Sequence, residues 1–251
     1  APDHAPRTGL DGPEGPRQGD AGDAGDEVIL HLMEQRSPEW LQIRVGKLTA
    51  SAAKAMLATI KTGFSAQRAD LRMQLACERL TGLSCEAPFT PNEAVQRGID
   101  KESDAIRAYE ALTGAVVSRV GFMEAESCAA GCSPDGVVEG LHGQRGLVEV
   151  KCPTTKVHVG YIRAGGIPST YQAQLTHSLW VAGPDYGYID FVSFDDRLPA
   201  GLELFVVRQD RDEAVMAAHQ AAVETFLAEV QDEVETLSAF QLAAQTRQGV
   251  S

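Results

Sequence analysis

The stretch CSPDGVVEGLHGQRGLVEVKC, residues 132–152, contains the residues that best predict the fold and the chemistry of this chain. Valine-rich runs over residues 133–139 and 146–151 flank a glycine-rich segment, which predicts two β-strands joined by a turn. Because side chains alternate between the faces of a strand, Glu149 and Lys151 are expected to point the same way, opposite to Val150. Asp135 stands at a Pro-Asp-Gly corner, from which it can bend toward the same edge. The stretch therefore predicts two carboxylates and one lysine at one end of a sheet.

This set of side chains suits metal-dependent hydrolysis of a phosphodiester. Carboxylate oxygens without a neighbouring histidine favour Mg²⁺ or Mn²⁺ over zinc. A lysine beside the metal can orient a water molecule, or accept its proton if the pKa of the lysine is lowered. The alternative is a solvated turn and strand face, since charged side chains are usually exposed. Glu149 and Lys151 stand between valines and before Cys-Pro, however, and burying an ion pair without a purpose is costly.

The flanking sequence predicts helices on both sides of these strands. Ser37-Pro38 is typical of a helix start, and Thr49 or Ser51 is expected to begin a second helix that reaches about residue 60. The expected fold is one α/β domain, with N-terminal helices, a mixed central β-sheet flanked by helices, and a long C-terminal helix. Further helices are expected over 66–81, 92–113, 168–181 and 211–240, and further strands over 116–123, 186–194 and 203–208.

The ends of the chain carry most of its net charge of −13 over 251 residues. Residues 1–27 hold seven acids and two bases, and residues 195–251 hold eleven acids and four bases, so residues 28–194 are nearly neutral. This distribution excludes a uniformly basic coat for nucleic acid, but it permits a local cationic site. Residues 1–27 are rich in glycine and proline and are expected to form a disordered leader. We expect a single domain over 28–240 and a tail over 241–251.

The sequence also indicates the cellular compartment in which the protein is expected to work. No run approaches 18 consecutive apolar residues, so no membrane span is expected. The N-terminus lacks the apolar core of a secretory signal. Five cysteines in a chain of this length do not suggest a disulfide framework. The expected location is therefore the cytoplasm.

The residues around the two strands resemble a known family. Asp135, Glu149 and Lys151 match the PD-(D/E)XK nuclease pattern, and GLVEVKCP, with SPDG before it and YQAQLTHSLWV after it, resembles the lambda-exonuclease (YqaJ-type) viral recombinases. WLQIRVGKLTAS, residues 40–51, resembles the N-terminal motif of that family, and Arg97-Gly98 with Glu102 resembles its helical carboxylate motif. The resemblance covers roughly residues 34–194 and implies a restriction-endonuclease-like core.

The resemblance implies a catalytic role for each matching residue. Asp135, Glu149 and the backbone carbonyl of Val150 would bind two Mg²⁺ ions, for which Mn²⁺ can substitute. Lys151 would position or deprotonate the attacking water, and Glu102 would lie near the metal-bound water.

Other matching residues are implied to orient groups and bind the DNA end. Gln174 would orient the lysine or a ligand, whereas the second glutamine of the family pattern is Thr176 here. The 5′-terminal phosphate would be held by Arg44, Ser51 and Ser133, with Trp40 packed beside them. Each of these residues also has a simpler interpretation: a solvated arginine, a helix cap, a turn residue and a core tryptophan.

The function implied is a Mg²⁺-dependent 5′-to-3′ exonuclease. It would digest one strand of linear double-stranded DNA, prefer 5′-phosphorylated ends, and leave 3′ overhangs for single-strand-annealing recombination. The family also implies a ring-shaped homotrimer, and a single-strand annealing protein is a candidate partner that the helix over 211–240 could contact, although packing on its own domain is the simpler expectation. Two alternatives stay open: a structure-specific or restriction-like endonuclease on the same core, and a non-catalytic DNA-binding protein.

Overall fold

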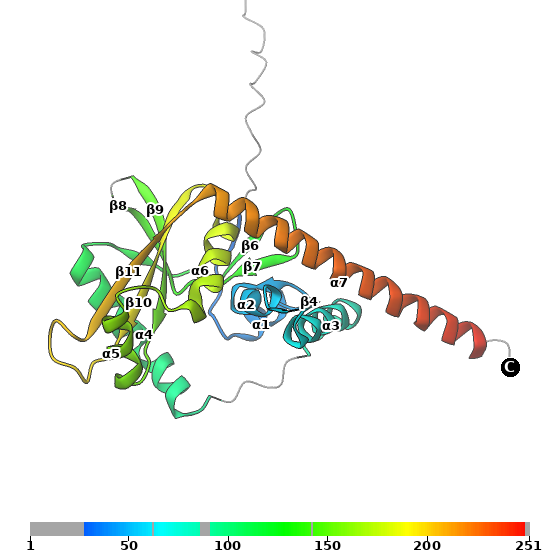
Figure 1. Ribbon diagram of the computed structural model, residues 1–251, viewed down its shortest axis with the longest axis horizontal. Coiled ribbons are helices and arrows are strands. Elements are labelled where there is room, and N and C mark those ends of the chain that lie inside the picture. Colours follow the sequence, from blue (N-terminus) through cyan, green and yellow to red (C-terminus); the bar gives the residue numbers. More distant parts are fainter. Residues whose placement is uncertain (1–27, 62, 86–90, 142, 249–251) are drawn as a thin grey trace, which may run out of the picture.

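The computed structural model describes residues 28–61, 63–85, 91–141 and 143–248 (Figure 1). The expected leader, residues 1–27, lies outside the described residues. The strands are β1 (Val28–His31), β2 (Leu48–Thr49), β3 (Thr59–Ile60), β4 (Gly63–Phe64), β5 (Val117–Ser118), β6 (Phe122–Ala125), β7 (Ala130–Cys132), β8 (Gly136–Leu141), β9 (Gln144–Lys151), β10 (Tyr186–Phe194) and β11 (Leu204–Asp210). The helices are α1 (Pro38–Ile43), the 3₁₀ turn η1 (Ala50–Ala52), α2 (Ala53–Met56), α3 (Ala66–Thr81), α4 (Glu93–Thr113), α5 (Thr155–Ala164), α6 (Ser169–Ala182) and α7 (Glu213–Gln248).

Two mixed β-sheets organise this part of the chain. The larger has the strand order β11-β10-β9-β8-β5, in which β9 and β10 run parallel and the other pairs are antiparallel. The smaller has the order β1-β6-β7-β2, with β2 and β7 parallel. The strands β3 and β4 form a separate hairpin. The expected mixed sheet flanked by helices is confirmed, although the strands are divided between two main sheets.

Helix boundaries follow the capping residues in the sequence. The Ser37 hydroxyl accepts a hydrogen bond from the Trp40 backbone N–H at the start of α1, and Asn92 caps α4 through the N–H of Val95. The α3 and α4 helices end at Gly82 and Gly114, whose φ angles of 69° and 73° lie in the left-handed region that glycine adopts without strain.

The strand expected over 116–123 is two strands, β5 and β6, which belong to different sheets. Three helical segments also differ from the sequence-based expectation. The helix expected to reach residue 60 ends at Met56, because the β-branched Thr59 and Ile60 pair with Gly63 and Phe64 in a hairpin. The α5 helix was not expected; together with α6 it forms the crossover that the parallel pairing of β9 and β10 requires. The last helix was expected to end near residue 240 but continues to Gln248, so residues 241–248 are helical.

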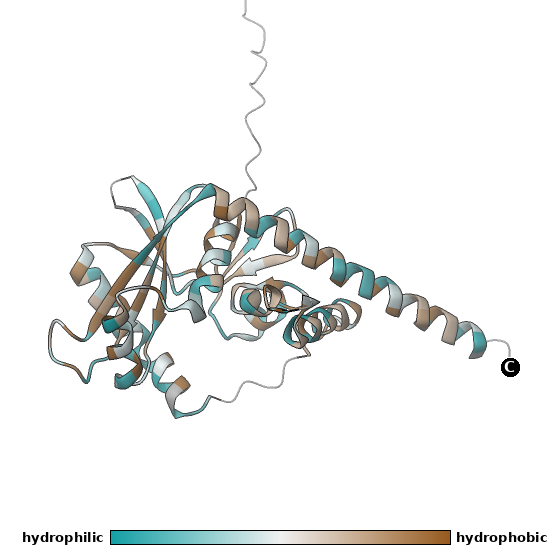
Figure 2. Ribbon diagram, in the orientation of Figure 1, coloured by the Kyte–Doolittle hydropathy of each residue, from teal (hydrophilic) through white to brown (hydrophobic). Residues whose placement is uncertain are grey.

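Helices cover both faces of the larger sheet. On one face α4 packs Ile106 and Tyr109 against Val148 and Val150, so Val150 points into a buried layer as expected. On the other side α6 lies between the strands and α7 (Figure 1). Figure 2 shows hydrophobic residues along the central strands. No helix in the described ranges is both long and apolar enough to cross a membrane.

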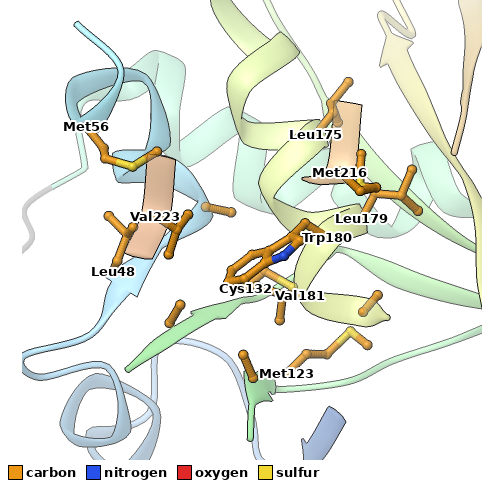
Figure 3. Close-up of a cluster of buried hydrophobic side chains, with 14 of the residues drawn as sticks. Leu48, Met56, Met123, Cys132, Leu175, Leu179, Trp180, Val181, Met216 and Val223 are labelled. Carbon is orange, nitrogen blue, oxygen red and sulfur yellow. The ribbon is translucent and has the colours of Figure 1, made fainter. Parts of the chain in front are cut away.

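A second core joins the smaller sheet to α6 and α7. In Figure 3 the Trp180 ring of α6 lies close to Cys132 of β7, with Leu48 of β2 and Val223 of α7 nearby. This core fixes the ends of β2 and β7 relative to α6, which also carries Gln174. Other members are Met56, Met123, Leu175, Leu179, Val181 and Met216.

The long α7 helix has two different parts. Its N-terminal part buries Val223, Phe226 and Val230 against its own domain, which is the simpler of the two expectations for this helix. The last turns extend beyond the body of the protein (Figure 1) and expose Phe240 and Leu242.

Candidate active site

The end of β9 brings three of the predicted residues together. The Nζ of Lys151 and the Nε2 of Gln174 both donate to Oε1 of Glu149, each over 2.5 Å. Glu149 is only 3% exposed, although it carries a carboxylate. The predicted alternation is therefore confirmed, because Glu149 and Lys151 share one face of the strand.

Asp135 reaches the same edge from the corner before β8. Its backbone N–H donates to the Val148 carbonyl over 3.0 Å, and its Oδ2 accepts the Val150 N–H over 2.7 Å. These two hydrogen bonds fasten the Pro-Asp-Gly corner onto β9. The carboxylate of Asp135, just before β8, and that of Glu149, on β9, therefore lie at the same end of the sheet.

The charges at this edge are not balanced. Burial is the main cause that raises the pKa of Asp135 to about 8, and the negative charges of Glu149 and Glu102 also raise this pKa. The positive charge of Lys151 lowers the pKa of Asp135 but does not cancel the increase. Burial alone would lower the pKa of Lys151, but the charges of Glu149 and Asp135 and its hydrogen bond to Glu149 raise it above the usual range. Lys151 thus remains an ammonium, and without a metal ion the site favours the protonated form of Asp135 more than water does.

These residues fit a hard divalent cation. Glu149 is buried and Asp135 half-buried, and burial together with the charge of Glu149 raises the pKa of Asp135, so this edge lacks positive charge. Oxygen ligands are those that Mg²⁺ prefers. In the described ranges no cluster of three or more Asp, Glu, His or Cys side chains forms a ready metal cage. The donors would accordingly be Asp135, Glu149 and the Val150 carbonyl, with the remaining positions left for water and substrate.

Glu102 lies across a cavity from Asp135. The cavity has a volume of about 370 Å³, and its lining includes Glu102, Asp135, Arg36 and Arg119. The Glu102 carboxylate accepts hydrogen bonds from Arg119 over 2.7 Å and from Arg36 over 3.4 Å. The predicted residue is thus at the site, but two arginines that the sequence analysis did not single out hold its carboxylate.

The four residues predicted to bind a terminal phosphate gather where two parallel strands end. The register Thr49↔Gly131 places Ser51 and Ser133 at the same end of β2 and β7, two residues beyond the paired positions. The Trp40 indole N–H lies 2.8 Å from the Ser133 hydroxyl. The Arg44 guanidinium lies over the Trp40 ring, 4.0 Å from its centre. Trp40 thus links Arg44 to Ser133, and the strand register places Ser51 at the same end. A guanidinium and two hydroxyls would be a suitable set of donors for a phosphate.

This pocket depends on a buried residue that the sequence analysis did not identify. Glu78 of α3 is 4% exposed and accepts the Gly46 N–H over 2.8 Å, while the Arg79 Nε donates to the Gly46 carbonyl over 2.9 Å. These bonds hold the turn that follows Arg44. Glu78 follows Leu71 and Leu75 at helical spacing, a pattern that could have identified it as an inward-facing acid.

Thr176 lies away from the carboxylates. Its hydroxyl accepts a hydrogen bond from Gln209 of β11 over 3.1 Å. Residues two positions apart on a helix point in different directions, so Gln174 and Thr176 cannot both face Glu149.

Comparisons with known proteins agree with this architecture. The sequence model of the YqaJ-like viral recombinase domain matches residues 39–185. The alkaline exonuclease LHK-Exo from Laribacter hongkongensis is 35% identical, with TM-scores of 0.72 in its complex with dAMP and 0.71 in a second crystal structure; the alignments cover 84% of this chain and all of that one.

A phage-related exonuclease from Haemophilus somnus shares the fold, with a TM-score of 0.53 at 16% identity over 78% of this chain and 96% of that one. No curated protein sequence matches the chain significantly. The family match covers more than half of the chain and agrees with the resemblance in the motifs. The chain therefore belongs to the YqaJ-like viral recombinase family.

Proposed function

We propose that this protein is a Mg²⁺-dependent 5′-to-3′ exonuclease that digests one strand of linear double-stranded DNA and leaves 3′ overhangs for single-strand annealing. One observation carries the proposal: Lys151 and Gln174 converge on the buried Glu149 beside Asp135, and Ser133 of the phosphate pocket stands two residues before Asp135. The similar alkaline exonuclease, which was crystallised with dAMP, supports a DNA substrate.

Each residue has a defined task in this proposal. Asp135 and Glu149 would hold a divalent cation, which would supply the Lewis acidity that activates water and offsets the charge of the phosphate. Lys151, held as an ammonium, donates hydrogen bonds that orient the attacking water or a phosphate oxygen. Gln174 fixes Glu149 by donating to Oε1. Arg44, Ser51 and Ser133 hold the 5′-terminal phosphate, so that the first phosphodiester lies at the carboxylates.

The test compares linear and covalently closed circular duplexes, with and without Mg²⁺, and follows nucleotide release from each labelled end. We expect release from the 5′ ends of linear DNA only, and only with Mg²⁺. Cleavage of circles would favour the endonuclease alternative, and binding without any release would favour a DNA-binding protein. Lys151→Ala should reduce turnover by about 10²- to 10⁴-fold while duplex binding persists; the exposed Lys156→Ala serves as the control.

The terminal phosphate pocket has its own test. Arg44→Ala should remove the preference for 5′-phosphorylated over 5′-hydroxyl ends, whereas the exposed Arg163→Ala should keep it. An equal loss of activity on both substrates in Arg44→Ala would contradict the assignment.

We also propose that the protein works as a ring-shaped homotrimer, with a single-strand annealing protein as a partner. Enclosing the duplex would explain how a protein with a nearly neutral central region holds DNA without neutralising many phosphates. Light scattering on the purified protein measures the mass directly, and a monomer would contradict the ring. Phe240→Ser tests whether the exposed end of α7 contributes to assembly.

A further inference from the structure

A strained turn projects an arginine into the cavity beside Asp135. The Ser37 N–H donates to the Glu34 carbonyl over 3.2 Å, which closes a four-residue turn with Arg36 at its third position. Arg36 has a φ of 72°, and no other non-glycine residue in the described ranges has a positive φ. Turns of this kind favour glycine or asparagine there, so an arginine is held at a cost to stability.

The turn is fastened to the loop that carries Asp135. The Gln35 side-chain amide donates to the Pro134 carbonyl over 3.0 Å and to the Val120 carbonyl over 3.1 Å. Pro134 directly precedes Asp135, and Val120 directly follows Arg119. Gln35 therefore ties the backbone next to both arginines to the loop that carries Asp135.

The contact with Glu102 does not explain the strain. Arg36 and Glu102 are 3.4 Å apart, and the Arg36 side chain is 44% exposed. An exposed ion pair of that length contributes little to stability. Arg119 already lies closer to Glu102, at 2.7 Å, and its side chain is 59% exposed. Two accessible guanidinium groups thus share one carboxylate at the rim of the active site.

Phosphate is the ligand that fits this pair. Guanidinium groups bind phosphate oxygens through paired hydrogen bonds. Among the described residues the two arginines share Glu102 as an acceptor, and Arg119 also donates to the Ser103 hydroxyl over 3.1 Å. Glu34 also lines the cavity, but the accessible cations are the two arginines. The lining includes Asp135 but none of the four residues of the terminal phosphate pocket. A phosphate at this position is therefore distinct from the 5′-terminal one.

We propose that Arg36 and Arg119 together bind an internal backbone phosphate of duplex DNA, and that Gln35 positions the strained turn for this contact. The inference rests on the proposed nuclease function and extends it to a second phosphate site. The terminal phosphate would lie at Ser133, the scissile phosphate at Asp135 and Glu149, and an internal phosphate at the two arginines.

The test measures duplex binding by fluorescence anisotropy at several salt concentrations, with Ca²⁺ in place of Mg²⁺. The duplexes carry either 5′-phosphoryl or 5′-hydroxyl ends. Arg36→Gly and Arg119→Ala should each weaken binding about tenfold and reduce the slope of log affinity against log salt by about 0.9. The loss should be equal on both duplexes, unlike that of Arg44→Ala. Arg107→Ala, an exposed arginine on α4 paired with Asp104, should bind as wild type.

Arg36→Gly provides a second readout, because glycine adopts a positive φ without strain. Its thermal midpoint should rise while DNA binding falls, and a lower midpoint would contradict the strain argument. Unchanged salt slopes in both variants, with active wild-type protein, would overturn the inference alone. A loss confined to 5′-phosphoryl duplexes would also overturn it, by assigning the arginines to the terminal phosphate. Wild-type protein that releases no nucleotides would overturn the proposed function itself.

Discussion

Asp135→Asn should make the metal-free protein more stable at alkaline pH, although it should destroy metal binding. The pKa of this carboxyl is about 8 in the folded protein and 3.8 in its unperturbed state. Between these values the unfolded chain has released the proton and the folded protein retains it, so stability falls as the pH rises. The free energy of unfolding can fall by at most about 1.4 kcal/mol for each pH unit through this one carboxyl.

The increase in the free energy of unfolding that we expect for Asp135→Asn is smaller than this limit allows, because the Asp135 side chain is partly exposed and water screens its charge. We expect Asp135→Asn to gain about 2–3 kcal/mol at pH 8, and almost nothing near pH 4. Asparagine retains an oxygen that can accept the Val150 N–H, so the variant removes charge without removing that hydrogen bond.

Urea unfolding in a chelating buffer at pH 5, 6.5 and 8 measures the difference. The exposed Asp70→Asn of α3 is the matched control and should show no pH-dependent gain. Adding Mg²⁺ at pH 8 should stabilise the wild type and leave Asp135→Asn unchanged, because binding to the native state raises its stability. An Asp135→Asn variant that is no more stable than wild type at pH 8 would refute the reasoning.

Three further predictions concern the affinity for Mg²⁺, the loss of stability in acid, and the turn beside the phosphate pocket. Because Asp135 must lose a proton to bind a cation, Mg²⁺ affinity measured by calorimetry should rise up to about tenfold per pH unit between pH 6 and 8; a flat profile would contradict this. His177 and His219 lie 3.0 Å apart, and burial lowers the pKa of His177 to about 3 and that of His219 to about 4. The unfolded chain takes up their protons below about pH 6.5, so His219→Gln should reduce the stability lost between pH 7 and 5 by about 1–2 kcal/mol in urea unfolding. Gly46→Ala should lower the thermal midpoint more than Gly82→Ala does. Both glycines have φ near 70°, but only at Gly46 would the new Cβ meet the Arg79 side chain, at 2.8 Å. Equal losses in the two variants would show that the Arg79 side chain moves aside without a cost to stability.

Much of the site could be predicted because its residues are close in the chain. Asp135, Glu149 and Lys151 belong to one strand pair, so period-two alternation and a tight corner place them together. Ser51 and Ser133 come from distant segments, and the motif resemblance rather than periodicity associated them. Their meeting depends on the parallel pairing of β2 and β7, two- and three-residue strands that are too short to give a pattern.

The residues that were not predicted act through tertiary contacts. Arg36 is an ordinary exposed arginine in the sequence, and its importance follows from a backbone angle and from the Gln35 contacts. The α5 helix begins two residues after Pro153 and has only ten residues, so its pattern is weak without the β9–β10 crossover that requires it. Long elements with clear caps, such as α3 and α4, were predicted nearly to the residue.

The Ser133-Pro134-Asp135 segment joins β7 of the smaller sheet to β8 of the larger one, and we expect it to determine how much DNA the proposed enzyme removes in each step. Consecutive Cα atoms are about 3.8 Å apart, so the Cα atoms of Ser133 and Asp135 are separated by no more than about 8 Å, and Pro134 stiffens the chain between them. If Ser133 and Asp135 act as proposed, we expect this fixed separation to correspond to one nucleotide, whatever the base. We expect a residue inserted beside Pro134 to disturb the size of the released product before it disturbs the chemistry.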